Sequence, residues 1–548
     1  MPMDPKHLQQ IDQNAKDLVL QLDGWVSDLS RHPGRSADRY GGDVEAAYRR
    51  LKSGMGRNSD VLMRKIQVPS VGSGTVLVVS IDGLTDTQMV DQDIIGPLLQ
   101  AKTPPDTWDQ TVLTPNHISK ETRWPKLLQK LAAGNTLVFA PGLDFVWVID
   151  TIKYTQRAIE RPQTELAVRG PEEAFNEIIL IQKTQLRRRF MSPALQFRDV
   201  TIGRMQHITV SVAFLEGVAN PALVETAIQR VQAITVDAVA DSTTISGLIR
   251  DHPNSIFPTI RGTERVDIVA RRLSYGAVAI LTAGDPFVLI APAPLADFYR
   301  TAMDYSNNWI DSSFVRLIRF VGWAFGLYLP AMYIALTQVN PSMLPTALFV
   351  VMQGSHSGLP FPPVVEILLM ILVLEILRES AIRLPKNLST TLGTVGAIVV
   401  GTAVVRAGLV DPQIIVIMTL TALSIFSTPV YDLTGTWRVV NFCLLFAGTF
   451  FGLLGIIVVT MMVVATITDM QSFGVPYFSP WAPFRLREWT DALLRFPWNR
   501  IHRRWVAYRP QRAEWNWPQG RVPRPHLLRG DNEASPLKTD MQGTEPGS

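Results

Sequence analysis

No Asp, Glu, Lys or Arg occurs between Phe320 and Val365, and four further long apolar blocks follow before Asp469. A helix needs about 20 residues to cross roughly 30 Å of hydrocarbon, so an apolar stretch of about 18 residues or more is typical of a membrane span. We therefore expect the C-terminal half to form an all-α polytopic transmembrane domain. The residues before about Asp311 have the pattern of a water-soluble region.

The composition agrees with such a mixed chain. Of the 548 residues, 47% are hydrophobic, and the mean hydropathy of +0.13 lies between the values typical of soluble proteins and of proteins made only of spans. Residues Met1 to Leu20 contain no apolar run of the kind that a secretory signal needs, so we expect the N-terminal region to be cytoplasmic. Cys443 is the only cysteine, which excludes an internal disulfide and a cysteine-based metal site.

Five apolar blocks are candidates for membrane spans: Arg316 to Val339, Val364 to Arg383, Leu388 to Val405, Pro412 to Tyr431 and Val439 to Thr468. Five crossings would place the two chain ends on opposite sides of the membrane. The arginine-rich tail, however, favours the cytoplasmic side under the positive-inside rule. Either one block does not cross fully or the long last block doubles back, and the sequence leaves both alternatives open.

The soluble half contains one pattern twice. A buried strand ending at Ile81 leads through Asp82-Gly83 into a helix, and a later helix ending at Gly134 precedes two strands joined by a tight turn. The same order recurs with Glu216-Gly217 and Gly276, which predicts two similar α/β subdomains in an α+β or α/β soluble region. The expected parts are a polar helical lead-in (1–61), a first subdomain with a linker helix (62–196), a second subdomain (197–311), the transmembrane domain (312–470) and an Arg/Trp-rich cytoplasmic tail (471–548).

Several longer motifs carry a family resemblance. They include Glu160-Arg161-Pro162-Gln163-Thr164-Glu165, Glu216-Gly217-Val218-Ala219-Asn220-Pro221, Thr263-Glu264-Arg265, Leu359-Pro360-Phe361-Pro362 and Ser472-Phe473-Gly474-Val475-Pro476-Tyr477. From about Asp82 to Phe484 the chain resembles the A subunits of spore germinant receptors, through which endospore-forming bacteria sense nutrients. The resemblance implies a homo-oligomeric ring, expected to be a pentamer, that acts as a nutrient-gated ion channel in the spore inner membrane. It also implies a germinant-binding B subunit and a lipoprotein C subunit as partners.

The block from Leu388 to Val405 is the candidate pore helix. Its small residues Gly393, Ala397 and Gly401 recur at four-residue spacing, which permits close helix packing. A neighbouring stripe at helical spacing is a candidate pore lining, with Ile398 expected at its narrowest point. The members of the stripe that we single out are Thr391, Thr394, Ile398 and Thr402. A closely packed bundle helix without a pore is the alternative for this block.

Glu366 and Glu375 are acidic residues inside an otherwise apolar helix, and charges at membrane depth often mark ion paths. Nine residues at about 100° per residue place the two on opposite helix faces, so they cannot line one pore together. Glu375 has Arg378 three residues on, which predicts a local ion pair. For Glu366, contact with solvent at the membrane edge is the alternative to a functional role. A secondary transporter would use one of these glutamates as its coupling residue, and a structural scaffold subunit is a third function to consider.

The tail combines arginines with tryptophans, a composition suited to anionic lipid headgroups. The residues expected at the membrane surface are Trp498, Arg500, Arg503, Arg504 and Trp505. Nucleic acid is a weaker candidate partner because the tail adjoins the membrane region. The sequence has no phosphate-binding loop, no histidine pair at metal spacing and no nucleophile elbow, so we expect neither an enzyme nor a cofactor or metal site.

Overall fold

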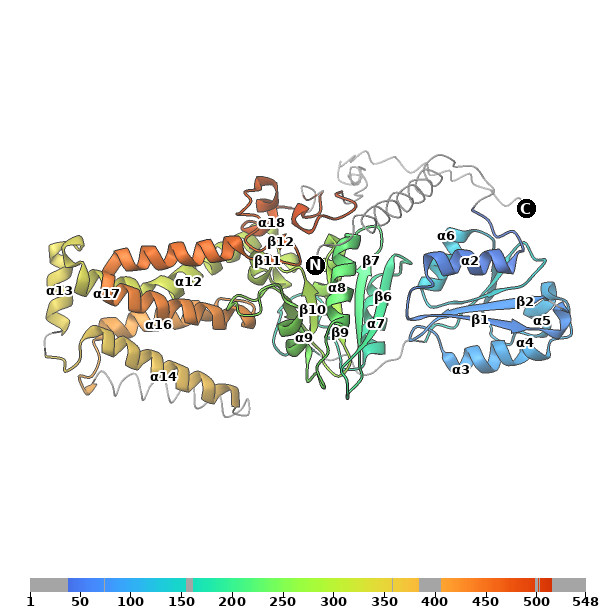
Figure 1. Cartoon of the computed structure of the whole chain (residues 1–548), viewed down its shortest axis with the longest axis horizontal. Coiled ribbons are helices and arrows are strands. Elements are labelled where there is room, and N and C mark those ends of the chain that lie inside the picture. The colour runs from blue at the N-terminus through green and yellow to red at the C-terminus, as the bar shows by residue number, and fades with distance from the viewer. Residues whose placement is uncertain are drawn as a thin grey trace, which may run out of the picture.

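The computed structural model describes residues 38–72, 74–153, 161–356, 358–383, 406–497, 501 and 503–514. Figure 1 shows these residues as three parts in a row: a first α/β domain at one end, a second α/β domain in the middle and a group of helices at the other end. The C-terminal segment returns to the second domain, where it lies beside the start of the helical part.

The first domain is an antiparallel five-stranded sheet with helices on both faces. In space the strands follow the order β1-β2-β4-β5-β3, and all neighbouring pairs are antiparallel. One apolar core lies under α2 and α6, and another lies under α3 to α5. The elements are α2 (Val44–Gly54), β1 (Val61–Gln67), β2 (Thr75–Ile81), α3 (Thr87–Met89), α4 (Gly96–Gln100), α5 (Trp108–Thr111), β3 (Ile118–Glu121), α6 (Trp124–Ala132), β4 (Thr136–Phe139) and β5 (Val146–Ile149).

The second domain has the same topology. Its sheet follows the order β6-β7-β9-β10-β8, which matches the first sheet strand for strand. The prediction that one pattern occurs twice is therefore confirmed at the level of strand order. The elements are β6 (Leu195–Ile202), β7 (Ile208–Leu215), α8 (Pro221–Gln232), α9 (Ser242–Ile249), β8 (Arg261–Thr263), α10 (Val266–Tyr275), β9 (Val278–Thr282) and β10 (Val288–Ala291).

Glycines in a left-handed conformation mark the equivalent turns. Gly83 and Gly217 both follow the second strand of their domain, with φ of 80° and 75°. Gly134 and Gly276 end the helices α6 and α10, with φ of 102° and 100°. Such φ values cost little only for glycine, so the sequence places it at both copies of each turn.

The helix α7 (Ile179–Arg189) joins the two domains and is buried although its sequence is polar. The Arg187 guanidinium donates two hydrogen bonds to the Asp60 carboxylate, at 2.8 and 2.9 Å, and both side chains are 1% exposed. Lys183 binds Asp199 at 2.7 Å. Because Asp60 belongs to the first domain and Asp199 to the second, α7 fixes one domain to the other through charge pairs.

The helical part follows the apolar blocks of the sequence. It contains α12 (Trp309–Ile334), α13 (Thr346–His356), α14 (Pro363–Arg383), α16 (Pro412–Phe426) and α17 (Tyr431–Asp469). Two described helices are long and apolar enough to cross a bilayer, 309–339, which includes α12, and 431–469, which is α17. The structure thus supports two candidate spans, and a domain of many spans is not shown.

The length and composition of α17 suit a crossing, but its backbone forms a hairpin rather than one straight helix. Gly452 interrupts α17 with a non-helical backbone, φ 61° and ψ −141°. The two arms run side by side in Figure 1, and Val440 and Cys443 of one arm line the same groove as Met462, Val463 and Thr466 of the other. Of the two alternatives that the sequence left open, the structure favours a last block that doubles back.

A proline in α12 is accommodated by this hairpin. Pro330 has no N–H to offer the carbonyl group of Gly326. The side-chain amide of Asn441 donates to the carbonyl oxygens of Gly326 and Leu327, both at 2.9 Å. An unpaired carbonyl is costly in an apolar environment, so Asn441 is a hydrogen-bonding partner that holds α12 against α17.

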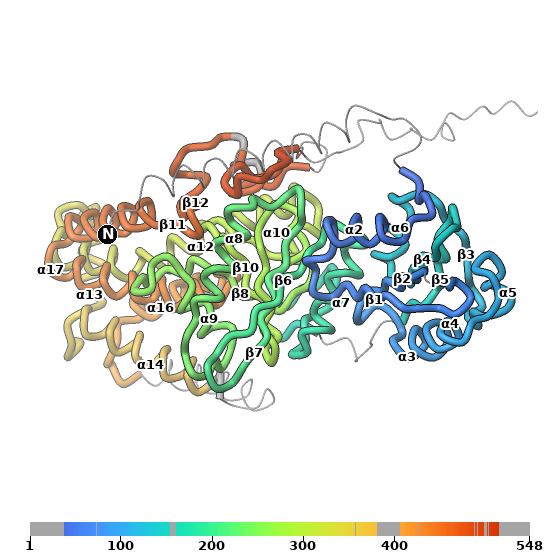
Figure 2. Tube along the Cα trace, turned by 45° about the vertical axis from the view of Figure 1, so that its right-hand side comes forward, coloured from blue at the N-terminus to red at the C-terminus, as the bar shows by residue number. Residues whose placement is uncertain are grey.

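The C-terminal segment contains β11 (Gln471–Ser472), β12 (Val475–Pro476), α18 (Trp489–Ala492) and the 3₁₀ turn η9 (Val506–Tyr508). Ala492, Trp505 and Tyr508 belong to the apolar core that includes Leu273 and Tyr275 of α10. The described part of the expected tail is therefore a folded cover on the second domain. Figure 2 shows this red segment lying along the second domain near α10.

Candidate functional site

A cluster of buried charged residues joins the second domain, the first apolar helix and the C-terminal segment. All of its side chains are at most 12% exposed. We call it the junction cluster, and it consists of Arg272, Asp297, Arg300, Asp304, Arg316, Arg319, Asp491 and Arg495.

Asp297 binds the second domain to the segment between β10 and α12, residues 292–308, which we call the connector. It lies in the 3₁₀ turn η4 (Leu295–Tyr299), and its carboxylate is 3.1 Å from Arg272 of α10 and 3.3 Å from Arg300. The Tyr508 hydroxyl of the C-terminal segment donates to the same carboxylate. One buried carboxylate therefore ties three segments together.

Asp304 and Asp491 hold the start of α12. Arg316 donates from Nε to Asp304 at 2.9 Å and from Nη1 to the Asp491 carboxylate at 3.2 Å. Arg319 lies 3.2 Å from Asp304, which is in the short helix α11 (Met303–Ser306), and Asp491 is in α18. The first turns of the apolar helix are thus bound to both the connector and the C-terminal segment.

The electrostatics of the cluster favour its charged state. Burial alone would raise the pKa of Asp491, but the charges of Arg300 and Arg316 outweigh it and the pKa lies below its ordinary value. The pKa of Asp304 is lowered in the same way, burial being outweighed by Arg316 and Arg319. Burial and the neighbouring Asp297 raise the pKa of the Tyr508 hydroxyl, so Tyr508 stays a hydrogen-bond donor. Removal of one partner from such a buried network typically costs several kcal/mol.

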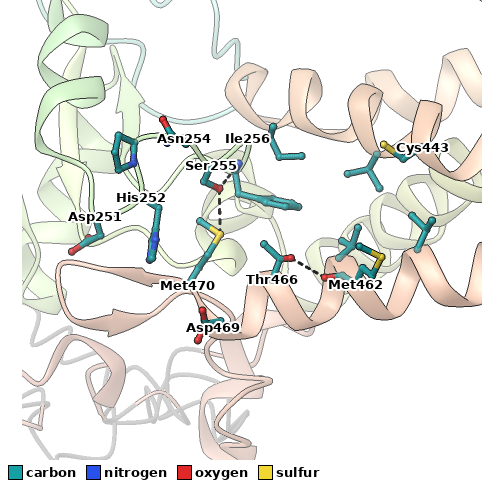
Figure 3. A pocket seen from close by; sticks show the side chains of 15 residues that line it. Asp251, His252, Asn254, Ser255, Ile256, Cys443, Met462, Thr466, Asp469 and Met470 are labelled. Atoms are coloured by element: carbon teal, nitrogen blue, oxygen red, sulfur yellow. Dashed lines mark hydrogen bonds between the residues drawn. The ribbon is translucent and has the colours of Figure 1, made fainter.

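The second domain also contacts the helical part beside the groove shown in Figure 3, which has a volume of about 760 Å³. The loop that begins at Asp251 faces the end of α17, where the Ser255 hydroxyl lies 3.4 Å from the sulfur of Met470. The carboxylate of Asp251 accepts a hydrogen bond from the backbone of Phe473 at 2.6 Å, just beyond the hairpin. Both ends of the helical part are thus attached to the second domain.

Glu366 is enclosed. Its side chain is 0% exposed, so the expected alternative of solvation at a membrane edge is wrong. Its Oε2 accepts a hydrogen bond from the Asp411 backbone at 2.7 Å, and its Oε1 lies 3.4 Å from Nδ1 of His356. Asp411 itself begins α16, accepting from the backbone of Gln413 and from the Ser355 hydroxyl, both at 2.8 Å. Two buried carboxylates and a histidine therefore meet between α13, α14 and α16.

Glu375 forms ion pairs. Its carboxylate lies 3.3 Å from Arg378, as the spacing predicted, and 3.0 Å from Arg438 of α17. The second pair links α14 to the hairpin and was not foreseen, because Arg438 is 63 residues away along the chain. No group of three or more His, Cys, Asp or Glu suited to a metal ion occurs among the described residues.

Other predicted residues are placed differently or lie outside the described ranges. The pore candidates Thr391, Thr394, Ile398 and Thr402 lie outside, as do Gly393, Ala397, Gly401, Trp498 and Arg500.

Trp505 is 4% exposed and stacks under Arg300 at 3.6 Å, so its expected position at a membrane surface is wrong. The Arg504 guanidinium is likewise held by backbone carbonyls, among them that of Ser274 at 2.7 Å. Only Arg503, half exposed beside Glu514, keeps a surface position.

Comparison with known proteins decides the family. The family model described as "Bacillus/Clostridium GerA spore germination protein" matches residues 49–506. The chain belongs to the GerA family of spore germination proteins. The matched range includes the whole junction cluster and all strands of both α/β domains.

Several relatives are similar over most of their length. Spore germination protein KA of Bacillus subtilis is 34% identical over 82% of this chain and 83% of its own. Spore germination protein GerLA of Bacillus cereus is 33% identical over 83% and 94%, and spore germination protein A1 of B. subtilis is 36% identical over 68% and 77%. The crystal structure of the N-terminal domain of the A subunit of the Bacillus megaterium germinant receptor GerK3 matches 47% of this chain and 98% of its own, at 27% identity and a TM-score of 0.36.

Proposed function

We propose that this chain is the A subunit of a spore germinant receptor that forms an oligomeric, nutrient-gated ion channel in the spore inner membrane. Its partners are the B and C subunits of the receptor, and its α/β domains are cytoplasmic. The family and the two candidate spans support the membrane receptor part of the proposal. The ring is proposed as a pentamer.

The observation that carries the gating part is the junction cluster. Asp304 and Asp491 are shared between the start of α12 and the segments packed on the second domain. Packed and charge-paired elements move together, so a displacement of the second domain is transmitted to α12 and, through Asn441, to the hairpin. In this proposal the α/β domains respond to activation of the receptor, and the membrane helices then open the pore.

The pore is proposed to be lined by the segment from Leu388 to Val405, with Ile398 at the constriction. A ring of isoleucine side chains would hold the pore dry when it is closed. Ion release from liposomes that carry Ile398→Ala is expected to be leaky, and Ile398→Trp is expected to block it. Val399→Trp serves as the matched control and should leave flux normal, because by helical spacing Val399 lies away from both the stripe and the small-residue face. Normal flux in both Ile398 variants would move the pore to another helix, and subunit counting in detergent tests the ring.

A secondary transporter is the second candidate, favoured by the enclosed Glu366 between Asp411 and His356. In a transporter, Glu366→Gln would abolish uptake driven by an ion gradient because the coupling charge is gone. In a channel the same variant leaves passive, downhill flux. Measurement of uphill uptake and downhill flux on one preparation separates the two functions.

A further inference from the structure

The junction cluster carries an excess of buried positive charge. Five arginines, Arg272, Arg300, Arg316, Arg319 and Arg495, meet three aspartates, Asp297, Asp304 and Asp491. Burial of net charge in a low-dielectric site is costly unless an opposite charge compensates it. The cluster is therefore electrostatically suited to bind an anion.

Arg316 offers a donor for that anion. Its Nε and Nη1 are engaged by Asp304 and Asp491, but its Nη2 is buried and has no hydrogen-bond partner among the described residues. The indole N–H of Trp323, two turns further along α12, is a second buried donor without an acceptor there. Buried donors are usually paired in proteins, and these two leave hydrogen-bonding capacity for a ligand because, unlike the unpaired nitrogens of Arg272 and Arg300, they belong to side chains that line a cavity.

Both side chains line one cavity of about 200 Å³. Its other walls are mainly apolar and aromatic, and the residues that matter here are Arg316, Arg319, Phe320, Trp323, Phe478 and Trp481. Two guanidinium groups thus meet a cavity whose remaining surface suits a hydrocarbon. A cavity of this size holds a headgroup and the first part of a chain rather than a whole lipid.

We propose that this cavity binds the phosphate group of an anionic phospholipid, with the start of an acyl chain against the aromatic walls. A lipid is favoured over free phosphate because Phe314, Leu317 and Val321 on the same turns of α12 are 62%, 45% and 44% exposed and present an apolar surface beside the site. Tryptophans at the end of an apolar helix are also typical of the headgroup layer. The inference rests on the proposed membrane location of this protein, and it assigns Arg316 as the residue that holds the phosphate.

The test uses the purified full-length chain in nanodiscs of phosphatidylcholine, with and without phosphatidylglycerol. The nanodiscs are then dissolved in detergent, and native mass spectrometry measures how much phosphatidylglycerol stays bound to the protein. Inorganic phosphate is tested as a competitor. Arg316→Gln should lower retention about tenfold, since a hydrogen bond between charged groups is removed. Leu493→Trp, which enlarges a half-buried side chain of the cavity wall and replaces no charged residue, should lower it similarly. Arg485→Gln, a partly exposed arginine paired with Glu488, is the control and should retain lipid normally.

Each outcome decides the matter. Equal retention of phosphatidylcholine and phosphatidylglycerol, or normal retention by Leu493→Trp, would overturn the site. Displacement of the lipid by millimolar inorganic phosphate would assign the cavity to free phosphate instead. Should Arg316→Gln fail to fold, Leu493→Trp still gives the answer because it replaces none of the charged residues of the junction cluster. Failure of the chain to enter nanodiscs of either composition would overturn the membrane location itself, a result distinct from insertion without lipid preference.

Discussion

The two α/β domains share one strand order but differ in what covers the helix that precedes the last hairpin of each sheet. In the first domain this helix is α6, and α2 packs against it through Ala47 and Leu51. In the second domain it is α10, and α7, which precedes the first strand as α2 does, packs against it with Leu186 in the shared core. The C-terminal segment covers α10 as well, through Trp505 and Tyr508. The same topological face thus carries a local helix in both copies, and in the second copy a distant segment covers it in addition.

The charged residues follow this difference. Counted back from the equivalent glycines Gly134 and Gly276, Lys130 of α6 corresponds to Arg272 of α10. Lys130 is exposed, whereas Arg272 is buried against Asp297. One topology can thus form an outer domain, where the charge at this position is exposed, or a domain attached to the helical part, where the charge is buried in an ion pair.

The largest difference between the domains is expected for Asp297→Asn. This change removes a carboxylate from a buried cluster that already has excess positive charge, so local unfolding near α10 should become easier by about 3–5 kcal/mol. Asp150→Asn changes an exposed residue directly after β5 of the first domain, and it should cost less than about 0.5 kcal/mol. Hydrogen exchange of peptides from α10 and α6 in the full-length protein measures both. Equal effects at the two sites would break the comparison.

Arg272→Gln and Lys130→Gln form the next pair. We expect Arg272→Gln to cost about 2 kcal/mol, because a buried ion pair is lost while the excess positive charge is relieved. Lys130→Gln should change local stability by less than about 0.5 kcal/mol. The same exchange experiment applies. A greater loss for Arg272→Gln than for Asp297→Asn would contradict the inferred charge balance of the junction cluster.

The junction cluster should also lose stability in acid. Asp304 and Asp491 have lowered pKa values in the folded protein, so the stability they contribute is present above their unfolded pKa of about 3.9 and is lost as the pH falls through their folded values. Amides of α11 and α18 should therefore lose protection in this acid range. In Asp304→Asn the slope should be shallower. An unchanged slope would show that other carboxylates determine acid unfolding at the junction.

Much of the fold was predictable because it is local. Strands such as Val76 to Ile81 and glycines such as Gly83 and Gly134 have signatures within a few residues, and these were found in both copies. The hairpin at Gly452 could only be posed as an alternative, since an uncharged run of 30 residues carries no signal of direction. Helical spacing gave the pair Glu375–Arg378 but not Glu375–Arg438.

The junction cluster was missed for the opposite reason. Its partners are far apart in the chain, as Arg316 and Asp491 show with a separation of 175 residues. Nothing near Trp505 in the sequence distinguishes a tryptophan that covers a buried arginine from one that lies in a membrane surface. The available signal was Arg316 and Arg319 at the start of an apolar helix, where uncompensated charge is costly and a partner is required.

The smallest expected difference concerns the equivalent glycines Gly83 and Gly217. Both have φ near 80°, so alanine at either position costs about 1 kcal/mol of backbone strain. A methyl group at Gly217 meets no atom within 4 Å, whereas at Gly83 it would lie 2.5 Å from the Thr184 hydroxyl of α7. Gly83→Ala should therefore cost more, by about 1 kcal/mol, and should loosen the bonds that α7 makes to both domains. Hydrogen exchange in α7 is the readout, with Gly217→Ala as the matched control. Equal effects of the two variants on hydrogen exchange in α7 would show that α7 shifts easily to make room for the added methyl group. It would then not be the rigid link between the domains.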